Sequence, residues 1–440
     1  VPSMFSIRKK LLIIIISIVM VFLILTIFYH YINSNIPKEE PVHGFPTFTI
    51  KDEIVSWIVK GKGPLITQYV RVDEYRKLIH LRIDEQTILS ITTKGEHKWR
   101  FVSDEDPISN MEIDAGGCLS VSTGKKIISL SPEGLVLWEM ETDKQIEALL
   151  PARNGLLYTL FKDGGISCFD KNGKRIWNKY FSKESDVHFG GIDIHDRLIV
   201  LSQSETVYCL DKSGEILWEI TLPEKFRNMP HLGRDASVYV FLDKVYCISP
   251  EGQLAWIYNN NDNDYINYIT TNDNGVLLSK AGGLTFLDKE GNLIWEYNHN
   301  WQPYYHLIEG RDGTIYLGGK DNSLIALNGD CTVKWTRQTE GVLSSNINED
   351  KNGNIYYSII LTDVKTLNYY KYNWQRTWVN YFHYLYMNDS MGRVIFRYGH
   401  HGFIEVCYLF EDGSILAGSF EEQCIYMLDP ACVKVAKFEN

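Results

Sequence analysis

The stretch Val207-Tyr-Cys-Leu-Asp-Lys-Ser-Gly-Glu-Ile-Leu-Trp218 returns in closely similar form as Leu284-Thr-Phe-Leu-Asp-Lys-Glu-Gly-Asn-Leu-Ile-Trp295. Tryptophans in this setting recur at intervals of 38 to 43 residues. They are Trp99, Trp138, Trp177, Trp218, Trp256, Trp295, Trp335 and Trp378. Eight tryptophans so spaced indicate an internal repeat of about forty residues. Such a repeat is the strongest indication of the fold class in this sequence.

The residues around each tryptophan repeat as well. A glycine stands four residues before it in six units, as Gly95, Gly134, Gly173, Gly214, Gly252 and Gly291. The consensus is an apolar residue, Asp, two variable residues, Gly, three variable residues and Trp. Glycine adopts the positive φ of a tight turn without steric cost, so the consensus predicts a strand, a turn and a second strand that ends near the tryptophan.

The upstream half of each unit predicts two more strands. Aliphatic residues such as Val207 and Leu284 stand eleven positions before each tryptophan, so the strand before the turn has apolar side chains on both faces. Turn signals such as Asn154-Gly155 and Asp312-Gly313 lie further upstream. Each unit therefore reads as four antiparallel strands, and radial stacking into a β-propeller buries both faces of such small sheets. We expect the tryptophans to lie between neighbouring blades with the indole N–H on a backbone acceptor; ligand stacking is the alternative.

We predict an all-β propeller of eight four-stranded blades over residues 46–440. A ninth, weaker unit has Ile425, Leu428, Cys432 and Ala436 at the consensus positions and an insertion around Asn388 to His401. We expect one marginal unit to be merged or peripheral, with seven or nine blades as the alternatives. The strand-like segment Thr47 to Trp57 precedes the first unit and is placed to pair with the carboxyl-terminal strands and close the ring.

The amino-terminal region differs in character from the repeats. Nineteen residues from Leu11 to Tyr29 carry no charge, which is enough to span a bilayer core as a helix. Arg8, Lys9 and Lys10 precede this run, so the positive-inside rule predicts a cytoplasmic amino terminus and an exported propeller. We therefore expect a short cytoplasmic segment (1–10), a transmembrane signal anchor (11–32) and a linker (33–45). A cleaved secretory signal is the alternative.

Charge excludes one class of partner. The chain carries 44 Lys and Arg against 55 Asp and Glu, for a net charge of −11. The part after residue 40 is more acidic still, because four of those cations and two of those anions precede it. A broad basic surface is therefore not expected, and nucleic acid is excluded as a partner.

The two quoted stretches resemble the repeats of the PQQ-like β-propellers, a superfamily that contains quinoprotein alcohol dehydrogenases and also non-catalytic scaffold proteins. The resemblance covers most of the chain after residue 60 and is specific for fold, not for function. Many of the dehydrogenases carry a disulfide between adjacent cysteines and a calcium ion at the quinone. None of the eight cysteines in this chain has a cysteine neighbour, and no Cys-x-x-Cys-His haem motif is present. We therefore nominate no catalytic, cofactor-binding or metal-binding residue and favour the non-catalytic branch.

Three further features bear on possible sites. Cys168, Cys209 and Cys247 share one repeat position and read as small buried residues. The Asn and Asp run from Asn259 to Asp264 lacks the spacing of a calcium loop and reads as a solvated loop. The densest aromatic stretch offers a candidate interaction patch on a divergent blade, with core packing as the alternative. Its candidate residues are Tyr370, Tyr372, Trp374, Tyr381 and Tyr384.

Two functions of different classes follow from this sequence. The favoured one is a membrane-anchored binding or scaffold module at the cell surface, whose partner is a protein or a cell-envelope glycan. The alternative is a quinoprotein-like oxidoreductase, or another propeller enzyme, that acts on a small molecule in the central channel. The favoured function requires no cofactor.

Overall fold

The computed structural model describes residues 55–61 and 69–429, without 105, 182–186, 203–204, 224–228, 242–243, 260–265, 273, 281–282, 299–306, 320, 344–345, 361–381, 402–403 and 420–423. All of the described residues belong to one compact unit, Ile50–Asn440. Their regular elements are 37 strands. The strands form nine separate antiparallel sheets, which we call blades 1 to 9.

Blades 1 to 5 have four strands each, which follow one another along the chain. Blade 1 is β2 (Val70–Asp73), β3 (Leu78–Arg82), β4 (Thr87–Thr92) and β5 (His97–Val102). Blade 2 is β6 (Asn110–Ile113), β7 (Leu119–Thr123), β8 (Lys126–Leu130) and β9 (Val136–Glu141). Blade 3 is β10 (Ile146–Pro151), β11 (Leu157–Phe161), β12 (Gly165–Phe169) and β13 (Arg175–Tyr180). Blade 4 is β14 (Val187–Ile192), β15 (Leu198–Ser202), β16 (Thr206–Leu210) and β17 (Ile216–Thr221). Blade 5 is β18 (His231–Leu232), β19 (Val238–Phe241), β20 (Lys244–Ile248) and β21 (Leu254–Asn259).

The remaining blades include two irregular ones. Blade 6 is β22 (Ile266–Asn272), β23 (Gly275–Lys280), β24 (Gly283–Asp288) and β25 (Leu293–Asn298). Blade 7 is β26 (Leu307–Glu309), β27 (Ile315–Gly318), β28 (Ser323–Leu327) and β29 (Val333–Gln338). In blade 8 the first strand is split into β30 (Val342–Leu343) and β31 (Asn348–Glu349), followed by β32 (Ile355–Ile360), β33 (Phe382–Asn388) and β34 (Val394–His401). Blade 9 joins β35 (Ile404–Leu409), β36 (Ile415–Ser419) and β37 (Cys424–Leu428) to β1 (Val55–Lys60).

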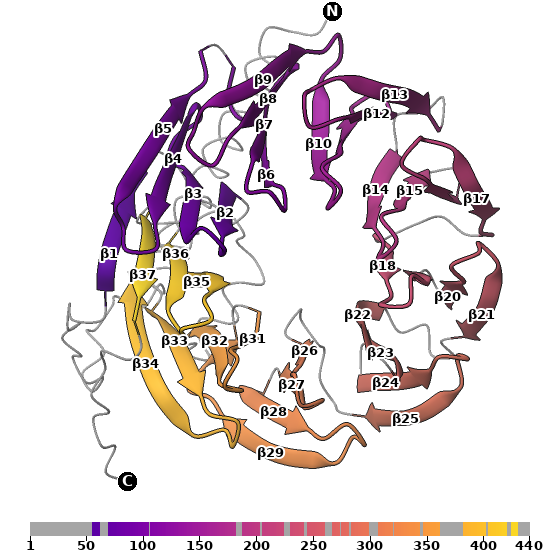
Figure 1. Cartoon of the computed structure of the whole chain (residues 1–440). Coiled ribbons are helices and arrows are strands. Elements are labelled where there is room, and N and C mark those ends of the chain that lie inside the picture. Colours follow the sequence, from indigo (N-terminus) through magenta and orange to yellow (C-terminus); the bar gives the residue numbers. More distant parts are fainter. Residues whose placement is uncertain are drawn as a thin grey trace, which may run out of the picture. The chain divides into compact units, whose positions relative to one another are not determined.

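The hydrophobic core is divided among the junctions between blades. The described residues form nine clusters of buried side chains, and each draws residues from two neighbouring blades. At the junction of blades 1 and 2, for example, Ile88 and Trp99 pack with Leu119. The two middle strands of a blade are buried on both faces, as β11 and β12 are throughout their length. The blades therefore stack around a ring, with β2, β6 and β10 on its inner side and β5, β9 and β13 on its outer side (Figure 1).

The ring closes through a strand from the amino-terminal side. β1 pairs antiparallel with β37, with Trp57 opposite Met427 and Lys60 opposite Cys424. Figure 1 shows this pairing as the indigo β1 beside the yellow β37. The expected closure by the segment that ends at Trp57 is thus confirmed for Val55–Lys60.

The predicted number of eight blades is wrong, because the weak ninth unit is a complete blade. No tryptophan follows β35, β36 and β37 in the sequence. The fourth strand of this blade is β1, which carries Trp57. In blade 8 the fourth strand is β34, where Phe396 stands four residues after Gly392. Trp378 lies outside the described residues. The predicted insertion at Asn388 to His401 is also wrong, since these residues form the end of β33, its turn and β34.

No helix in the described ranges has the length and apolar character needed to cross a bilayer. The predicted anchor (11–32) and linker (33–45) both lie outside those ranges.

We expect Trp57→Ala to lower the free energy of unfolding by about 2 to 4 kcal/mol, because it removes a large side chain from the junction that closes the ring. The matched control is Ile58→Ala on the same strand, where the side chain is 49% exposed and its loss costs less than about 1 kcal/mol. Urea denaturation of both variants measures the difference. Equal losses would show that Trp57 does not hold the closing strand.

Candidate functional site

The consensus sequence builds the turn that precedes each outer strand. In blade 4 the Gly214 amide donates to the Asp211 carbonyl oxygen at 3.0 Å, and Gly214 has a φ of +83°. Asp211 Oδ1 accepts the amides of Ser213 and Glu215, both at 2.9 Å. The hydrogen bond from the Ser213 hydroxyl is the main cause that lowers the pKa of Asp211 below its usual value. The aspartate therefore stabilises the turn from outside, while the glycine supplies its backbone conformation.

The tryptophans join each blade to the turn of the next one. In eight blades the indole Nε1 donates to a carbonyl oxygen in the third turn of the following blade, at 2.7 to 3.1 Å. The pairs are Trp57 with Thr93, Trp99 with Pro132, Trp138 with Lys171, Trp177 with Lys212, Trp218 with Pro250, Trp256 with Lys289, Trp295 with Gly329 and Trp335 with Ser390.

The turn glycine is the surface on which the tryptophan of the preceding blade lies. A Cβ atom on Gly252 would stand 2.3 Å from Trp218 Cγ, and one on Gly134 would stand 2.5 Å from Trp99 Cγ. The same close approach occurs at Gly95, Gly173, Gly214, Gly291 and Gly392. In these seven blades glycine therefore serves two purposes, because it adopts the positive φ and leaves space for the indole. In blade 7 the position is Cys331, which adopts a φ of +68°.

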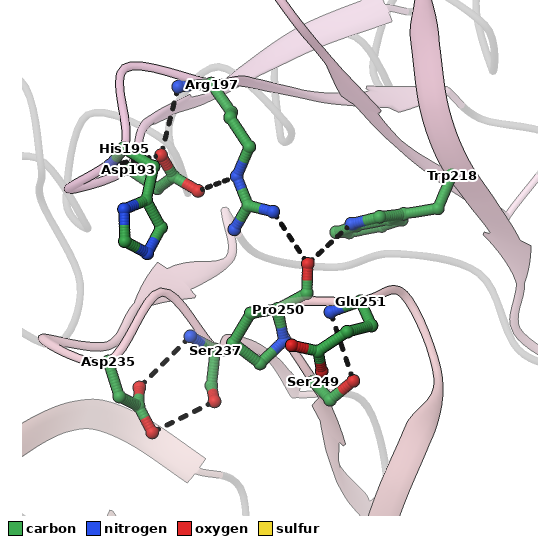
Figure 2. A network of polar contacts seen from close by, with 9 residues as sticks. All are labelled: Asp193, His195, Arg197, Trp218, Asp235, Ser237, Ser249, Pro250 and Glu251. Carbon is green, nitrogen blue, oxygen red and sulfur yellow. Dashed lines mark hydrogen bonds and ion pairs between the residues drawn. The ribbon is translucent and has the colours of Figure 1, made fainter.

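Figure 2 shows the most elaborate of these joints, between blades 4 and 5. The Pro250 carbonyl oxygen accepts both Trp218 Nε1 at 3.0 Å and Arg197 Nη1 at 2.7 Å. Asp193, whose side chain is fully buried, holds the guanidinium through a 2.6 Å contact to Nε. One carbonyl of blade 5 is therefore held by two side chains of blade 4.

Cys168, Cys209 and Cys247 lie directly opposite Trp177, Trp218 and Trp256 in the sheet register. All three are buried free thiols. Burial raises the pKa of Cys209 to about 11 and that of Cys168 and Cys247 to about 12. Thiols held in the neutral form are poor nucleophiles, so the geometry gives these cysteines a packing role.

Exposed aliphatic side chains gather on the outer strands of blades 2 to 6. We call this set the outer belt. It consists of Val136 and Leu137 on β9, Ile176 on β13, Ile216 and Leu217 on β17, Leu254 on β21, and Leu293 and Ile294 on β25. Their side chains are 39 to 56% exposed. In blades 1 and 7 the position of Leu137 is occupied by Lys98 and Lys334. Blade 7 keeps one exposed aliphatic residue on its outer strand, Val333, at the position of Val136.

A β-bulge explains why two consecutive residues face outward in the belt. In β17, Trp218 lies opposite Cys209 and Ile216 lies opposite Leu210, so Leu217 is an extra residue between them. β9 and β25 have the same irregularity at Leu137 and Ile294. Each outer strand is also the last strand of its sheet, so one side of its backbone has no strand partner within the sheet. The belt thus combines apolar side chains with unpaired strand edges, the two features that favour strand addition by another chain.

The sequence did not single out the belt, although its residues stand at fixed positions just before the tryptophan. Apolar residues in a repeat are normally assigned to the core, and only the bulge turns this pair outward. One signal distinguishes the exposed positions from core positions. Blades 1 and 7 have Lys98 and Lys334 at the position of Leu137, and lysine is rarely buried.

Four of the five residues predicted as an aromatic interaction patch lie outside the described ranges, namely Tyr370, Tyr372, Trp374 and Tyr381. Tyr384 is described, and it is 7% exposed in the cluster at the junction of blades 7 and 8. The Arg397 guanidinium stacks 3.9 Å from the centre of its ring and also binds Glu340 through both Nη atoms. Tyr384 is therefore a core residue, and its assignment to an exposed patch is corrected.

Two observations concern the alternative function, chemistry in the central channel. Among the described residues, no group of three or more His, Cys, Asp or Glu side chains is arranged to hold a metal ion. On the inner strands, Arg71 of β2 binds Glu112 of β6 through Nε at 2.9 Å and Nη2 at 2.5 Å. These two charged groups pair with each other across neighbouring blades, so their geometry gives them a role in joining the blades.

We expect Gly252→Ala to destabilise the ring more than Gly155→Ala does. Both glycines have nearly the same φ, +84° and +82°, so both variants carry the backbone cost of about 1 to 2 kcal/mol. A Cβ on Gly155 would meet nothing within 4 Å, whereas one on Gly252 would collide with Trp218. Thermal or urea unfolding of the pair therefore isolates the tryptophan contact. Indistinguishable stabilities would contradict the role given to it.

Sequence and structure comparisons agree with this geometry. Residues 162–303 match the family model described as outer membrane protein assembly factor BamB, whereas no curated protein matches the chain. A crystal structure of the eukaryotic initiation factor is similar with a TM-score of 0.59 at 12% identity, over 84% of this chain and 92% of that one. BamB from Moraxella catarrhalis gives a TM-score of 0.47 at 17% identity, over 69% and 95%. The computationally designed Ika8 protein gives 0.49 at 13%, over 86% and 100%. Such low identities show the fold alone, and the family match is confined to residues 162–303, a segment whose repeats are similar to those of the PQQ-like β-propellers.

Proposed function

We propose that this chain is a scaffold that binds extended segments of partner proteins along the outer strands of blades 2 to 6. The observation that carries the proposal is the outer belt, in which exposed aliphatic residues, paired in blades 2, 4 and 6 and single in blades 3 and 5, stand on strand edges that are open on one side. Contiguous exposed apolar surface commonly marks a protein-interaction site. An added strand gains main-chain hydrogen bonds from the edge and specificity from the side chains beside it.

Two further observations support a protein partner. The matching family model is described as an assembly factor for outer membrane proteins. The belt follows the outside of a ring, so it is convex. A partner with a flat surface would touch few blades at once, whereas a flexible polypeptide is able to follow the curve. Repetition over five blades also allows several weak contacts to act together, because the second contact of a tethered partner forms at high effective concentration.

The proposal includes the setting of the propeller. The apolar run from Leu11 to Tyr29 and the basic residues before it support a single-pass anchor with its amino terminus in the cytoplasm and the ring on the other side of the membrane. A photocrosslinker placed in the ring of the full chain, in intact cells, tests both the setting and the partner.

We expect a photoreactive phenylalanine analogue at Leu137, Leu217 or Ile294 to crosslink the full-length protein to the same partner. The matched control is the same probe at Tyr75, which is 90% exposed in blade 1 outside the belt. Leu217→Glu should weaken capture by a probe at Ile176 several-fold, while Leu217→Ile, which stays apolar, should not. Because Leu217 is 51% exposed, neither change should move the free energy of unfolding by more than about 0.5 kcal/mol. Equal capture at Tyr75 and on the belt would overturn the proposal.

A further inference from the structure

Blade 1 carries a histidine at a position where blades 3, 5 and 7 carry a tyrosine and blade 2 carries Ser120. On the second strand of blades 3, 5 and 7 this position is Tyr158, Tyr239 or Tyr316, and each ring lies 5.9 Å from the tryptophan of its own blade. The corresponding residue of blade 1 is His80, whose ring lies 5.3 Å from Trp99 in a stacked arrangement. His80, Ser90 and Trp99 are opposite one another in register across β3, β4 and β5. Their side chains therefore share one face of the sheet.

That face is turned toward blade 2. Trp99 lies in the cluster with Ile108, Met111 and Leu119, and its indole N–H reaches Pro132 in blade 2. His80 and Ser90 are both 0% exposed. Neither ring nitrogen of His80 has a hydrogen-bond partner among the described protein groups, and the Ser90 hydroxyl has none either. A neutral imidazole needs one acceptor and one donor, and a hydroxyl needs at least one partner, so three buried polar atoms are left to be satisfied.

The charged groups around this face leave the imidazole neutral. Burial lowers the pKa of His80 to about 4, and the nearby Asp73 carboxylate opposes the shift only in part. Asp73 is itself bound to Arg76 at 3.0 Å. Arg71, which is opposite His80 on β2, is bound to Glu112 of blade 2. Asp73 and Arg71 are therefore paired with other residues, and Arg82, on the same face of β3 as His80, donates to the Ile108 carbonyl oxygen. A neutral hydrogen-bonding molecule is the partner that fits the site.

We propose that the junction of blades 1 and 2 contains an internal water-binding site formed by His80 and Ser90. An imidazole is smaller than the phenol ring that occupies the same position in blades 3, 5 and 7, and its neighbour on the same face, Ser90, is small as well. Buried water characteristically occupies such places, where two or more otherwise unsatisfied polar groups converge. The bound water completes the hydrogen bonds of both side chains in a junction that is otherwise apolar.

This site makes the stability of the junction between blades 1 and 2 depend on pH. The pKa of His80 is lower in the folded chain than the value of 6.5 in the unfolded chain, so the unfolded chain binds more protons between these two values. The contribution of His80 to stability is therefore fully present above pH 6.5 and is lost as the pH falls toward 4.

The test is a high-resolution crystal structure of the protein together with pH-dependent unfolding of two variants. We expect ordered water within hydrogen-bond distance of a His80 ring nitrogen and of Ser90 Oγ. His80→Tyr copies blades 3, 5 and 7; it should exclude the water and flatten the loss of Tm between pH 6.5 and pH 4. Ser90→Ala copies Ala326 at the same position of blade 7. It should disorder the water but keep the pH dependence, because His80 still titrates.

Two results would overturn the inference. One is a dry site in the crystal structure, with both ring nitrogens bonded to protein groups or to none. The other is a His80 ring that titrates near pH 6.5 by NMR in the folded wild-type protein, which would show that the imidazole is solvated from outside. If His80→Tyr does not fold, the crystal structure and the Ser90→Ala profile still decide the question.

Discussion

The contact of an indole with the turn of the next blade is the interaction on which the ring depends. A four-stranded sheet of about forty residues is too small to bury both of its faces, so its stability comes from its two neighbours. The indole contributes both an apolar contact and a hydrogen bond to the junction. It buries a large apolar surface against a glycine, and its single polar atom finds a carbonyl oxygen at 2.7 to 3.1 Å in eight of the nine described blades. The glycine and the tryptophan of the consensus are therefore partners, although they belong to different blades when they meet.

This arrangement explains why the propeller class follows from the sequence but the number of blades does not. Gly and Trp at constant spacing report the junctions directly. The tryptophan spacing gives a wrong count in two places. At one junction the tryptophan is replaced by Phe396, and at another it is Trp57, which comes from the amino-terminal strand β1. Trp378 lies 43 residues after Trp335, close to the expected interval. The repeat pattern therefore assigned the tryptophan of blade 8 to Trp378, although the residue at that junction is Phe396. Counting turn glycines instead, with Gly392 among them, would have marked blade 8 correctly.

The candidate site was harder to predict for a different physical reason. Val136 and Leu137, or Ile216 and Leu217, look like core residues because sequence alone does not show which side of a strand they face. The bulge beside each tryptophan adds one residue and turns the pair outward. His80 was visible in principle, since it stands where blades 3, 5 and 7 have Tyr. Its significance depends on having no partner within the fold, which only the coordinates reveal.

Blade 9 has a consequence for the order of events during synthesis. Its four strands come from opposite ends of the folded region, so β1 leaves the ribosome first among them and must wait for β37. Until then the growing chain is an arc of stacked sheets, with one uncovered face at each end. Pairing over such a sequence separation is slow, since a very long loop must close before any contact compensates for it. The ring therefore has no means of closing before β37 is made, and a chaperone that shields the two exposed faces would act on this arc.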